Sequence, residues 1–242
     1  MKQRIWIMGA SEGIGAELAR QWSGHGADLI LSARSEDALA SIAAEIGGAE
    51  VLPADVTDPA SLCRAAEAIA SRGSIDRAIT LAALYEPGQV MQVDPELAAR
   101  IVEVNMTGTF NFVRAAVPLL RPGGQLVLTG SIAGYVGLPQ AQIYSATKAG
   151  VTNLAETLRA ELAPQVDVRL ISPGFVDTRM TRKNDFDMPG IIAANEAGRR
   201  IIKGLDARGF EIHFPRRMTF LFKLLRVLPY PLALRLTRRL VR

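Results

Sequence analysis

The hydrophobic positions along the chain follow two alternating periods, one typical of buried strands and the other of amphipathic helices. Residues 4–8 form an apolar run of strand length, and the segment after them places Ile14, Leu18 and Ala19 on one side of a helix. The same alternation recurs along most of the chain. It predicts strands at residues 4–8, 28–32, 50–53, 76–81, 125–129, 166–171 and 209–213.

Helix signals fill the intervals between these strands. Ser35 is a suitable N-cap for a helix that ends at Gly47-Gly48, and the Asp-Pro pairs at 58–59 and 94–95 place a proline in the first turn of two more helices. Further helices are predicted at residues 13–22, 94–120, 142–163 and 189–203.

Strands separated by helices of this length predict right-handed crossovers and therefore a parallel sheet. The expected fold class is α/β, a doubly wound Rossmann-type parallel sheet of about seven strands flanked by helices. Residues 1–213 are expected to form a single domain, followed by a basic amphipathic helical extension at 214–242. Ligands of such sheets bind at the carboxyl ends of the strands.

A glycine-rich turn follows the first predicted strand, with Gly9, Gly13 and Gly15 in the sequence GASEGIG. Three glycines at this spacing allow a tight turn into a helix and let backbone N–H groups approach a pyrophosphate, which the positive end of the helix dipole also attracts. The turn therefore predicts a nucleotide site. Glycines also end strands for steric reasons alone, so this motif is weak by itself.

The residue after the second strand distinguishes the two nicotinamide dinucleotides. An NAD site places a carboxylate there, but this chain has Ser32-Ala33-Arg34. Arg34 can pair with a 2′-phosphate and stack on adenine, which favours NADP(H) over NAD(H). Two points stand against this prediction: Arg34 can equally be a solvated surface residue, and Glu12 in the glycine turn would repel a phosphate.

Tyr144 and Lys148 stand four residues apart, so on a helix they share one face. A cation beside the phenol lowers its pKa, which makes Tyr144 a candidate general acid for ketone reduction and general base for alcohol oxidation. Ser131 follows the fifth predicted strand, where its hydroxyl can donate to a substrate oxygen that gains negative charge. Alone, the Tyr–Lys spacing arises often by chance, and Ser131 can equally be a turn residue.

Jointly these residues resemble a known family. Gly9–Gly15, Asp55, Asn105, Ser131, Tyr144, Lys148 and Pro173-Gly174 resemble, in order and spacing, the motif series of the short-chain dehydrogenase/reductase family over roughly residues 4–178. The resemblance implies that Ser131 binds the substrate oxygen and that Tyr144 exchanges the proton. It also implies that Lys148 holds the nicotinamide ribose and that Asn105 holds a water in the proton relay.

The resemblance also implies a set of cofactor-binding residues. Asp55-Val56 resembles the adenine contact of the family, and Pro173-Gly174 with the segment to Thr178 resembles its nicotinamide wall. The whole set comprises Gly9, Ser11, Glu12, Gly13, Ile14, Gly15, Arg34, Asp55, Val56, Tyr144, Lys148, Pro173, Gly174, Val176 and Thr178. The chain departs from the family at residues 80–83, which read Thr-Leu-Ala-Ala instead of Asn-Asn-Ala-Gly, and at Met8, which replaces a threonine.

Composition agrees with a soluble globular enzyme. Hydrophobic residues make up 49% of the 242 residues and charged residues 21%. The single cysteine, Cys63, cannot form an intrachain disulfide and fits a reducing compartment, and no His/Cys cluster has metal-ligand spacing, so no metal is expected. No secretory signal or transmembrane run is present, which predicts a cytoplasmic location.

The charge of the chain is concentrated in its C-terminal extension. Residues 214–242 hold eight basic side chains and no acid, which leaves 20 basic against 24 acidic side chains elsewhere, although the whole chain has a net charge of +4. Leucines and basic residues in this extension alternate at helical spacing, with breaks at Pro229 and Pro231. Such helices suit either a membrane surface or packing on this protein or a second copy. Nucleic-acid binding is not expected, because the extension lacks a recognised motif and the remainder is acidic.

The function predicted from the sequence is an NADP(H)-dependent carbonyl reductase or alcohol dehydrogenase that acts on a small, lipophilic carbonyl or alcohol. The family resemblance also implies a homo-oligomer, a dimer or tetramer built on the long helices 94–120 and 142–163. The alternatives are a non-enzymatic dinucleotide-binding regulator and a scaffold peripheral to a membrane. Met180, Phe186, Met188 and Ile191, in the segment expected to form a substrate lid, indicate an apolar pocket.

Overall fold

The computed structural model describes residues 2–238 and shows the expected α/β fold. Seven strands form one parallel sheet in the order β3-β2-β1-β4-β5-β6-β9. The strands are β1 Arg4–Met8, β2 Asp28–Ser32, β3 Glu50–Val51, β4 Ile75–Thr80, β5 Leu120–Thr129, β6 Val166–Pro173 and β9 Glu211–Phe214. The prediction of a doubly wound parallel sheet is confirmed.

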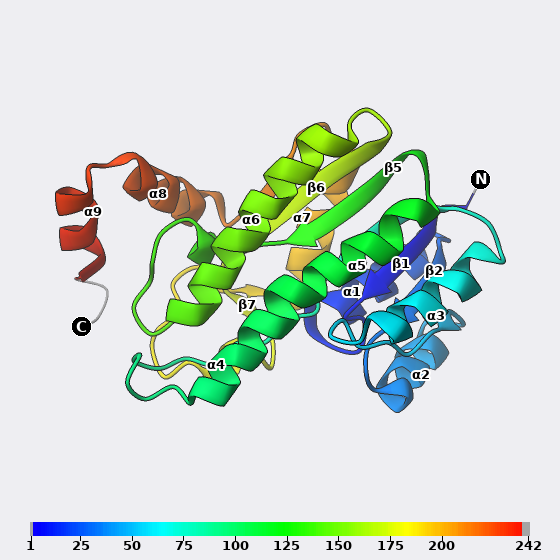
Figure 1. The fold of residues 1–242 in the computed structure, drawn as a ribbon, viewed down its shortest axis with the longest axis horizontal. Coiled ribbons are helices and arrows are strands. Elements are labelled where there is room, and N and C mark those ends of the chain that lie inside the picture. The colour runs from blue at the N-terminus through cyan, green and yellow to red at the C-terminus, as the bar shows by residue number, and fades with distance from the viewer. Residues whose placement is uncertain (1, 239–242) are drawn as a thin grey trace.

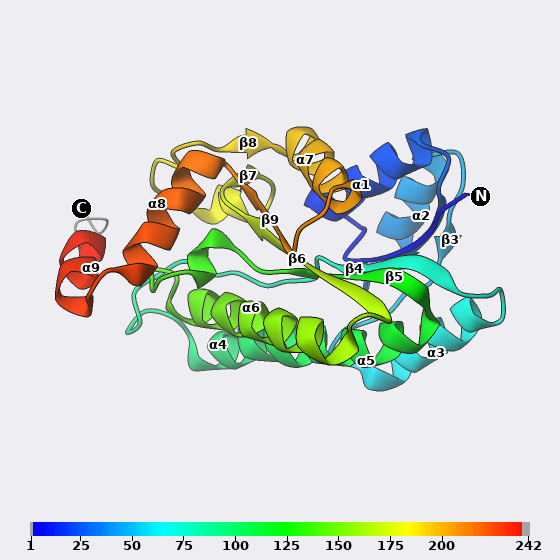
Figure 2. The ribbon, with the colours of Figure 1, turned by 90° about the horizontal axis from the view of Figure 1, so that it is seen from above.

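Helices cover both faces of the sheet and make a three-layered domain (Figures 1 and 2). One face carries α1 (Gly13–Gly24), α2 (Glu36–Glu45) and α7 (Ala194–Asp206). The other carries α3 (Pro59–Ala70), α4 (Pro95–Val102), α5 (Gly108–Ala116) and α6 (Gln142–Leu162).

The side chains of β1 explain why both faces need helices. Ile5 and Ile7 belong to the core beneath α1, α2 and α7, whereas Trp6 and Met8 belong to the core on the opposite face. Consecutive strand residues point to opposite faces, so a strand that is apolar at every position must be covered twice. All five residues of β1 are buried.

The strand order places a topological switch between β1 and β4. From β1 the chain crosses to β2 and β3 on one side, and then returns to β4 and continues to the other side. Helices at such a point diverge and leave a crevice at the carboxyl ends of the two central strands. This position is where Gly9 and Leu81 follow the ends of β1 and β4.

The long helix predicted at 94–120 is interrupted. A π-helical turn at Glu103–Thr107 separates α4 from α5, and a short 3₁₀ turn at Val117–Leu119 ends the segment. Pro118 lies in that last turn and has no N–H group to continue an α-helix. The π-helical turn contains Asn105, and such turns inside α-helices often occur at functional sites.

The helix predicted at 189–203 also differs from the structure. Ile192–Ala193 instead forms a short strand, β8, which pairs with β7 (Val176–Asp177), and the helix α7 begins only at Ala194. Gly190 explains the late start, because its φ of +69° lies in a left-handed region that an α-helix cannot continue through. The pairing of β7 with β8 therefore holds together the two ends of the segment that connects them.

The C-terminal extension forms the two predicted helices, α8 (Arg216–Val227) and α9 (Tyr230–Thr237). Both lie at one end of the molecule, beyond the layers that cover the sheet (Figures 1 and 2). Pro229 is the N-cap of α9 and Pro231 lies in its first turn, which explains the break between the helices. Within residues 2–238, no helix combines the length and apolar character required to cross a membrane.

Candidate active site

A cleft with a volume of about 460 Å³ opens at the carboxyl ends of the central strands. All fifteen residues predicted to bind the cofactor line this cleft, and so does Ser131. They come from segments as distant in sequence as the glycine turn and the end of β6. Asn105, by contrast, lies outside the lining. The structure thus brings together every predicted site residue except one.

The glycine turn is shaped by close backbone contacts. A Cβ atom on Gly15 would lie 2.0 Å from the carbonyl oxygen of Gly9, and one on Gly9 would lie 2.7 Å from the amide nitrogen of Ala82. Gly9 and Gly13 also have φ values of +89° and +57°. No side chain caps the amino end of α1, and the first residues of this helix, Gly13 to Gly15, line the cleft. These features fit a bound pyrophosphate.

Arg34 lies exposed at the edge of the cleft, next to the loop after β3. Asp55 lies in that loop, where its Oδ1 accepts hydrogen bonds from the amide of Thr57 at 2.9 Å and from the hydroxyl of Thr57 at 2.8 Å. Burial raises the pKa of the Asp55 carboxyl, but the bonds from Thr57 and the charges of Arg34 and Arg100 outweigh it, so the pKa is lowered. The exposed guanidinium of Arg34 at this edge of the cleft suits a ribose that carries a phosphate.

Glu12 is neutralised by an arginine that the sequence did not reveal as its partner. Its carboxylate lies 2.9 Å from Nη2 of Arg179, which follows β7. Both side chains are more than half exposed, so the pair adds little stability. It does place a positive charge beside Glu12, and this reduces the repulsion that the carboxylate would exert on a phosphate.

Tyr144, Lys148 and Ser131 meet at the inner end of the cleft. Tyr144 and Lys148 project from α6, with the Lys148 Nζ 5.7 Å from the centre of the Tyr144 ring. The Nζ donates a hydrogen bond of 2.8 Å to the carbonyl oxygen of Thr129 at the end of β5. Ser131 lies two residues beyond that strand end, close enough to Tyr144 for its hydroxyl to lower the pKa of the phenol.

The pKa values of this cluster are governed by burial. Burial raises the pKa of the Tyr144 phenol to about 12, and the nearby Ser131 hydroxyl opposes this only in part. Burial lowers the pKa of Lys148 to about 8. The expectation that Lys148 depresses the pKa of Tyr144 is therefore not met by the protein's own groups, and at neutral pH the phenol holds its proton while Lys148 remains largely charged.

A 3₁₀ turn at Ile132–Gly134 fixes the position of Ser131. The Ser131 Oγ accepts from the amide of Ala133 at 3.1 Å and lies 3.4 Å from the carbonyl oxygen of Pro173, to which it donates. A Cβ on Gly134 would lie 2.7 Å from the backbone of Lys148, and Ser145 donates to the carbonyl of Ala133. The turn is thereby packed directly on the helix that carries Tyr144.

Asn105 supports this arrangement from behind the cleft. Its side chain is completely buried; Oδ1 accepts from the Leu84 amide at 2.7 Å, and Nδ2 donates to the Leu84 carbonyl at 2.9 Å. Nδ2 also donates to Thr147 Oγ1 at 3.1 Å, and that hydroxyl in turn donates to the carbonyl of Tyr144 at 2.7 Å. The carbonyl of Asn105 accepts from Thr109 at 2.7 Å.

Tyr85 is a site residue that the sequence reasoning missed. Its ring packs edge-on against Tyr144 with the centres 4.9 Å apart, and its hydroxyl donates to Asn184 Oδ1 at 2.7 Å. Burial raises its pKa to about 12. No local pattern marks Tyr85, because its partners lie 59 and 99 residues away along the chain. Tyr85 connects Tyr144 to the segment expected to form the lid.

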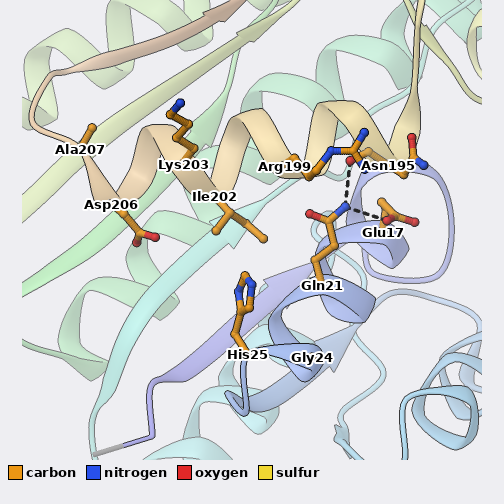
Figure 3. Close-up of a pocket in the computed structure, with 10 residues that line it drawn as sticks. All are labelled: Glu17, Gln21, Gly24, His25, Asn195, Arg199, Ile202, Lys203, Asp206 and Ala207. Carbon is orange, nitrogen blue, oxygen red and sulfur yellow. Dashed lines mark hydrogen bonds between the residues drawn. The ribbon is translucent and has the colours of Figure 1, made fainter.

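A second hollow, of about 910 Å³, lies between α1 and α7 (Figure 3). Gln21 crosses part of it and donates to Glu17 Oε1 at 2.7 Å and to the carbonyl of Asn195 at 2.8 Å. None of the predicted site residues lines this hollow. The cleft at the strand ends is therefore the candidate active site.

Comparison with known sequences agrees with this geometry. The family model described as short chain dehydrogenase matches residues 3–188. The chain is 32% identical to the 3-oxoacyl-[acyl-carrier-protein] reductase FabG of Escherichia coli K12 over 199 residues, which are 80% of this chain and 82% of that protein. It is 30% identical to 11-beta-hydroxysteroid dehydrogenase 1A of Arabidopsis thaliana over 83% of its own length, and spans 60% of that longer relative.

Among solved structures, a short chain dehydrogenase from Burkholderia cenocepacia J2315 in complex with NADP is similar throughout. The TM-score is 0.85 with 31% sequence identity, and the match covers 97% of both chains. The similarity therefore includes the cleft together with most of the C-terminal extension.

We expect Asn105→Ala to lower the free energy of unfolding by about 2–4 kcal/mol, because the buried amide and carbonyl of Leu84 would lose their partner. Urea denaturation measures this change. Asn153→Ala, at an exposed position of α6, is the matched control and should change stability by less than about 0.5 kcal/mol. Equal effects of the two substitutions would contradict the bonding described for Asn105.

Proposed function

Because the chain belongs to the short-chain dehydrogenase family, we propose that it is an NADP(H)-dependent oxidoreductase acting on carbonyl and alcohol groups. The catalytic unit is residues 1–213. The observation that carries the proposal is the convergence of Tyr144, Lys148 and Ser131 in the cleft that the glycine turn also lines. Hydride donor and proton donor would then approach one substrate carbonyl from the two sides of a single cleft.

The protein's own residues supply proton transfer and orientation. The protonated Tyr144 phenol gives its proton to the substrate oxygen in reduction and takes it back in oxidation. Ser131, fixed by the turn at Ile132–Gly134, donates a hydrogen bond to the same oxygen. Lys148, whose Nζ lies 5.7 Å from the centre of the Tyr144 ring, would hold the nicotinamide ribose beside the phenol.

Asn105 has a positioning role in this proposal. Through Thr147 it holds the backbone of Tyr144, and through Leu84 it holds the cleft wall that follows β4. That Asn105 also holds a relay water stays a prediction from the family resemblance. Its side-chain bonds by themselves support the positioning role.

The cofactor is NADP(H), which supplies or accepts the hydride when bound. The glycine turn and the uncapped start of α1 would hold its pyrophosphate, and Asp55-Val56 its adenine. Arg34 would pair with the 2′-phosphate, since no carboxylate follows β2 to accept from a free 2′-hydroxyl. Pro173, Gly174, Val176 and Thr178 would flank the nicotinamide. The similar Burkholderia cenocepacia structure contains NADP, which supports this choice.

The substrate is a lipophilic carbonyl or alcohol. Phe186 packs edge-on against Phe175 with ring centres 5.9 Å apart, and Met180 lines the cleft. An apolar lid favours a substrate that buries hydrocarbon on binding. The names of two relatives, a 3-oxoacyl reductase and a hydroxysteroid dehydrogenase, refer to carbonyl or hydroxyl groups on lipophilic skeletons, which agrees with this class.

We also propose a homo-oligomer, a dimer or tetramer, formed through the outer surfaces of α4, α5 and α6. Val102 and Phe110 remain 42% and 48% exposed on the first two of these helices. Apolar side chains of this size on the outside of a helix pair favour burial against another copy. Sedimentation velocity of the purified chain measures the oligomeric state.

Tyr144→Phe should lower kcat for ketone reduction with NADPH by about 10²–10⁴-fold, because only the proton donor is removed. Isothermal titration should show NADPH binding unchanged within a few-fold. Normal turnover by the variant would contradict the mechanism. If the unsubstituted chain bound NADPH but reduced no ketone or aldehyde on a broad panel, the alternative of a non-enzymatic dinucleotide-binding regulator would take its place.

Arg34→Ala should weaken NADPH binding by about 10- to 100-fold and leave NADH binding nearly unchanged, because only NADPH carries the 2′-phosphate. Dissociation constants for both cofactors provide the measurement. Arg64→Ala, which removes an exposed arginine of α3 near Asp58, is the matched control. An equal loss for the two cofactors would show that Arg34 does not contact the phosphate.

Affinity for NADPH should fall as the pH rises through about 8, because the Lys148 ammonium loses its proton at this lowered pKa. Below this pH the cation is present to hold the nicotinamide ribose, and above it the affinity should fall by up to about tenfold per pH unit. Fluorescence titrations of NADPH from neutral pH to about pH 10 test this. In Lys148→Met the dependence should disappear; a step that persists in this variant would belong to another group.

A further inference from the structure

The helix α8 is docked with its apolar side outward. Phe220, Leu221, Leu224 and Val227 are 61%, 56%, 56% and 76% exposed, whereas Thr219 is completely buried. A helix that covered the core of its own domain would do the opposite, burying its large apolar residues and exposing its polar ones. Packing on the domain accounts for Leu225, which is 7% exposed, but it does not explain the outward Leu221 and Leu224.

The helix α9 shows the same inversion. Its small or polar residues Ala233 and Thr237 are each 7% exposed, while the leucines and the tyrosine point to solvent. The exposed large residues of α9 are Tyr230, Leu232, Leu234 and Leu236. Single exposed apolar side chains are ordinary on protein surfaces, but here eight large ones lie on two adjacent helices. Apolar patches of this kind mark sites of interaction.

Specific bonds hold α8 in this orientation. Lys223 Nζ donates to Glu211 Oε2 at 2.5 Å, and Thr219 Oγ1 lies 2.7 Å from His213 Nδ1. Glu211 also accepts from Ser172 Oγ at 2.6 Å and from the hydroxyl of Tyr135. The polar side of α8 is thus bound to β9, and the outward direction of its apolar side is set by the fold.

Charge identifies the partner. The exposed basic residues of α8, α9 and the residue that follows are Arg216, Arg217, Arg226, Arg235 and Arg238, and residues 214–242 contain no acid. We propose that the outward face of α8 and α9 docks on an anionic lipid bilayer, with the leucines in the acyl boundary and the arginines at the headgroups. A second copy that used the same face in a two-fold dimer would offer these arginines no carboxylate from its own extension, because residues 214–242 contain none.

The wall of the cleft adjoins the extension, because a Cβ on the cleft residue Gly174 would lie 2.8 Å from Pro215. Gly190 of the lid lies against Pro215 and Met218 at the start of α8, so lid and extension are neighbours. Further exposed apolar side chains come from the lid, at Phe186 and Ile191, and from the loop before α4, at Val90 and Met91. Figure 1 shows α8, α9 and this loop on one side of the sheet. Resting on the proposed function, the docking also implies that the lipophilic substrate reaches the cleft from the bilayer.

Flotation of the full chain with vesicles tests the docking. The chain should float with vesicles of phosphatidylcholine mixed with phosphatidylglycerol, bind at least tenfold less to phosphatidylcholine alone, and dissociate as sodium chloride screens the headgroup charge. Equal binding to both vesicle types, or none to either, would overturn the proposal.

Paired variants separate charge from hydrophobicity. Arg226→Gln with Arg235→Gln should lower partition onto anionic vesicles roughly 25-fold, since each arginine near such a surface contributes about a fivefold factor. Leu221→Ser with Leu224→Ser should lower it roughly tenfold or more. Arg64→Gln with Arg208→Gln removes the same charge from exposed positions on α3 and after α7, and should change the partition less than twofold. If both arginine pairs lowered the partition equally, binding would depend only on the net charge of the protein, and the proposed docking face would be refuted.

Sedimentation velocity without lipid tests the alternative that a second copy of the chain covers the outward face of α8 and α9. The leucine variant should keep the mass of the parent chain. Loss of an oligomer in this variant, together with absence of vesicle binding by the parent chain, would assign the face to another copy and overturn the lipid proposal.

Two further measurements keep this proposal distinct from the oxidoreductase assignment. Tyr144→Phe should float like the parent chain, because it lacks only the proton donor. With a long-chain ketone dissolved in anionic vesicles, the leucine variant should lose at least tenfold in kcat/KM while retaining the parent value on a water-soluble ketone. Equal loss on both ketones would refute delivery from the bilayer, and failure to turn over either ketone by the parent chain would refute the oxidoreductase assignment alone.

Discussion

The backbone contact between Gly15 and the carbonyl of Gly9 is the constraint around which the cleft is built. With only 2.0 Å available to a Cβ at Gly15, the first turn of α1 must lie directly on the end of β1. The loop after β4 packs on the same turn through Ala82, and Asn105 holds that loop from behind at Leu84. These contacts together position the glycine turn relative to Tyr144. The close approaches at Gly9 and Gly15 require residues without a Cβ, and the contact at Leu84 requires an amide side chain that bonds both backbone groups.

Much of this arrangement could be predicted from the sequence because the signals are local. The apolar runs gave all seven strands of the large sheet, although β5 begins five residues before the predicted strand 125–129 and the short strands β7 and β8 were missed. The spacing of Tyr144 and Lys148 placed both on one helix face. Other features depend on contacts between distant segments. Nothing in the sequence around Asn105 shows that its amide fits the backbone of Leu84, that Tyr85 would reach Asn184, or that Arg179 would pair with Glu12. The raised pKa of Tyr144 likewise reflects burial by residues from several elements.

The C-terminal helices show a different limit. Their spacing predicted two helices correctly, but the pattern did not predict that α8 buries Thr219 and Leu225 while it exposes Leu221 and Leu224. That choice is made by β9, which presents Glu211 and His213 to Lys223 and Thr219. The outcome runs against the usual direction of burial, and only the partners on the neighbouring strand explain it.

Glu211 is a junction at which three parts of the chain meet. Tyr135, one residue beyond the 3₁₀ turn that carries Ser131, donates to it, as do Ser172 near the end of β6 and Lys223 of α8. A protein shortened before α8 would leave this half-buried carboxylate without its cationic donor, and the change would reach Tyr135, which is four residues from Ser131. Truncation would therefore report a disturbed active site as well as a missing surface, whereas substitutions on the outer side of α8 leave the junction intact.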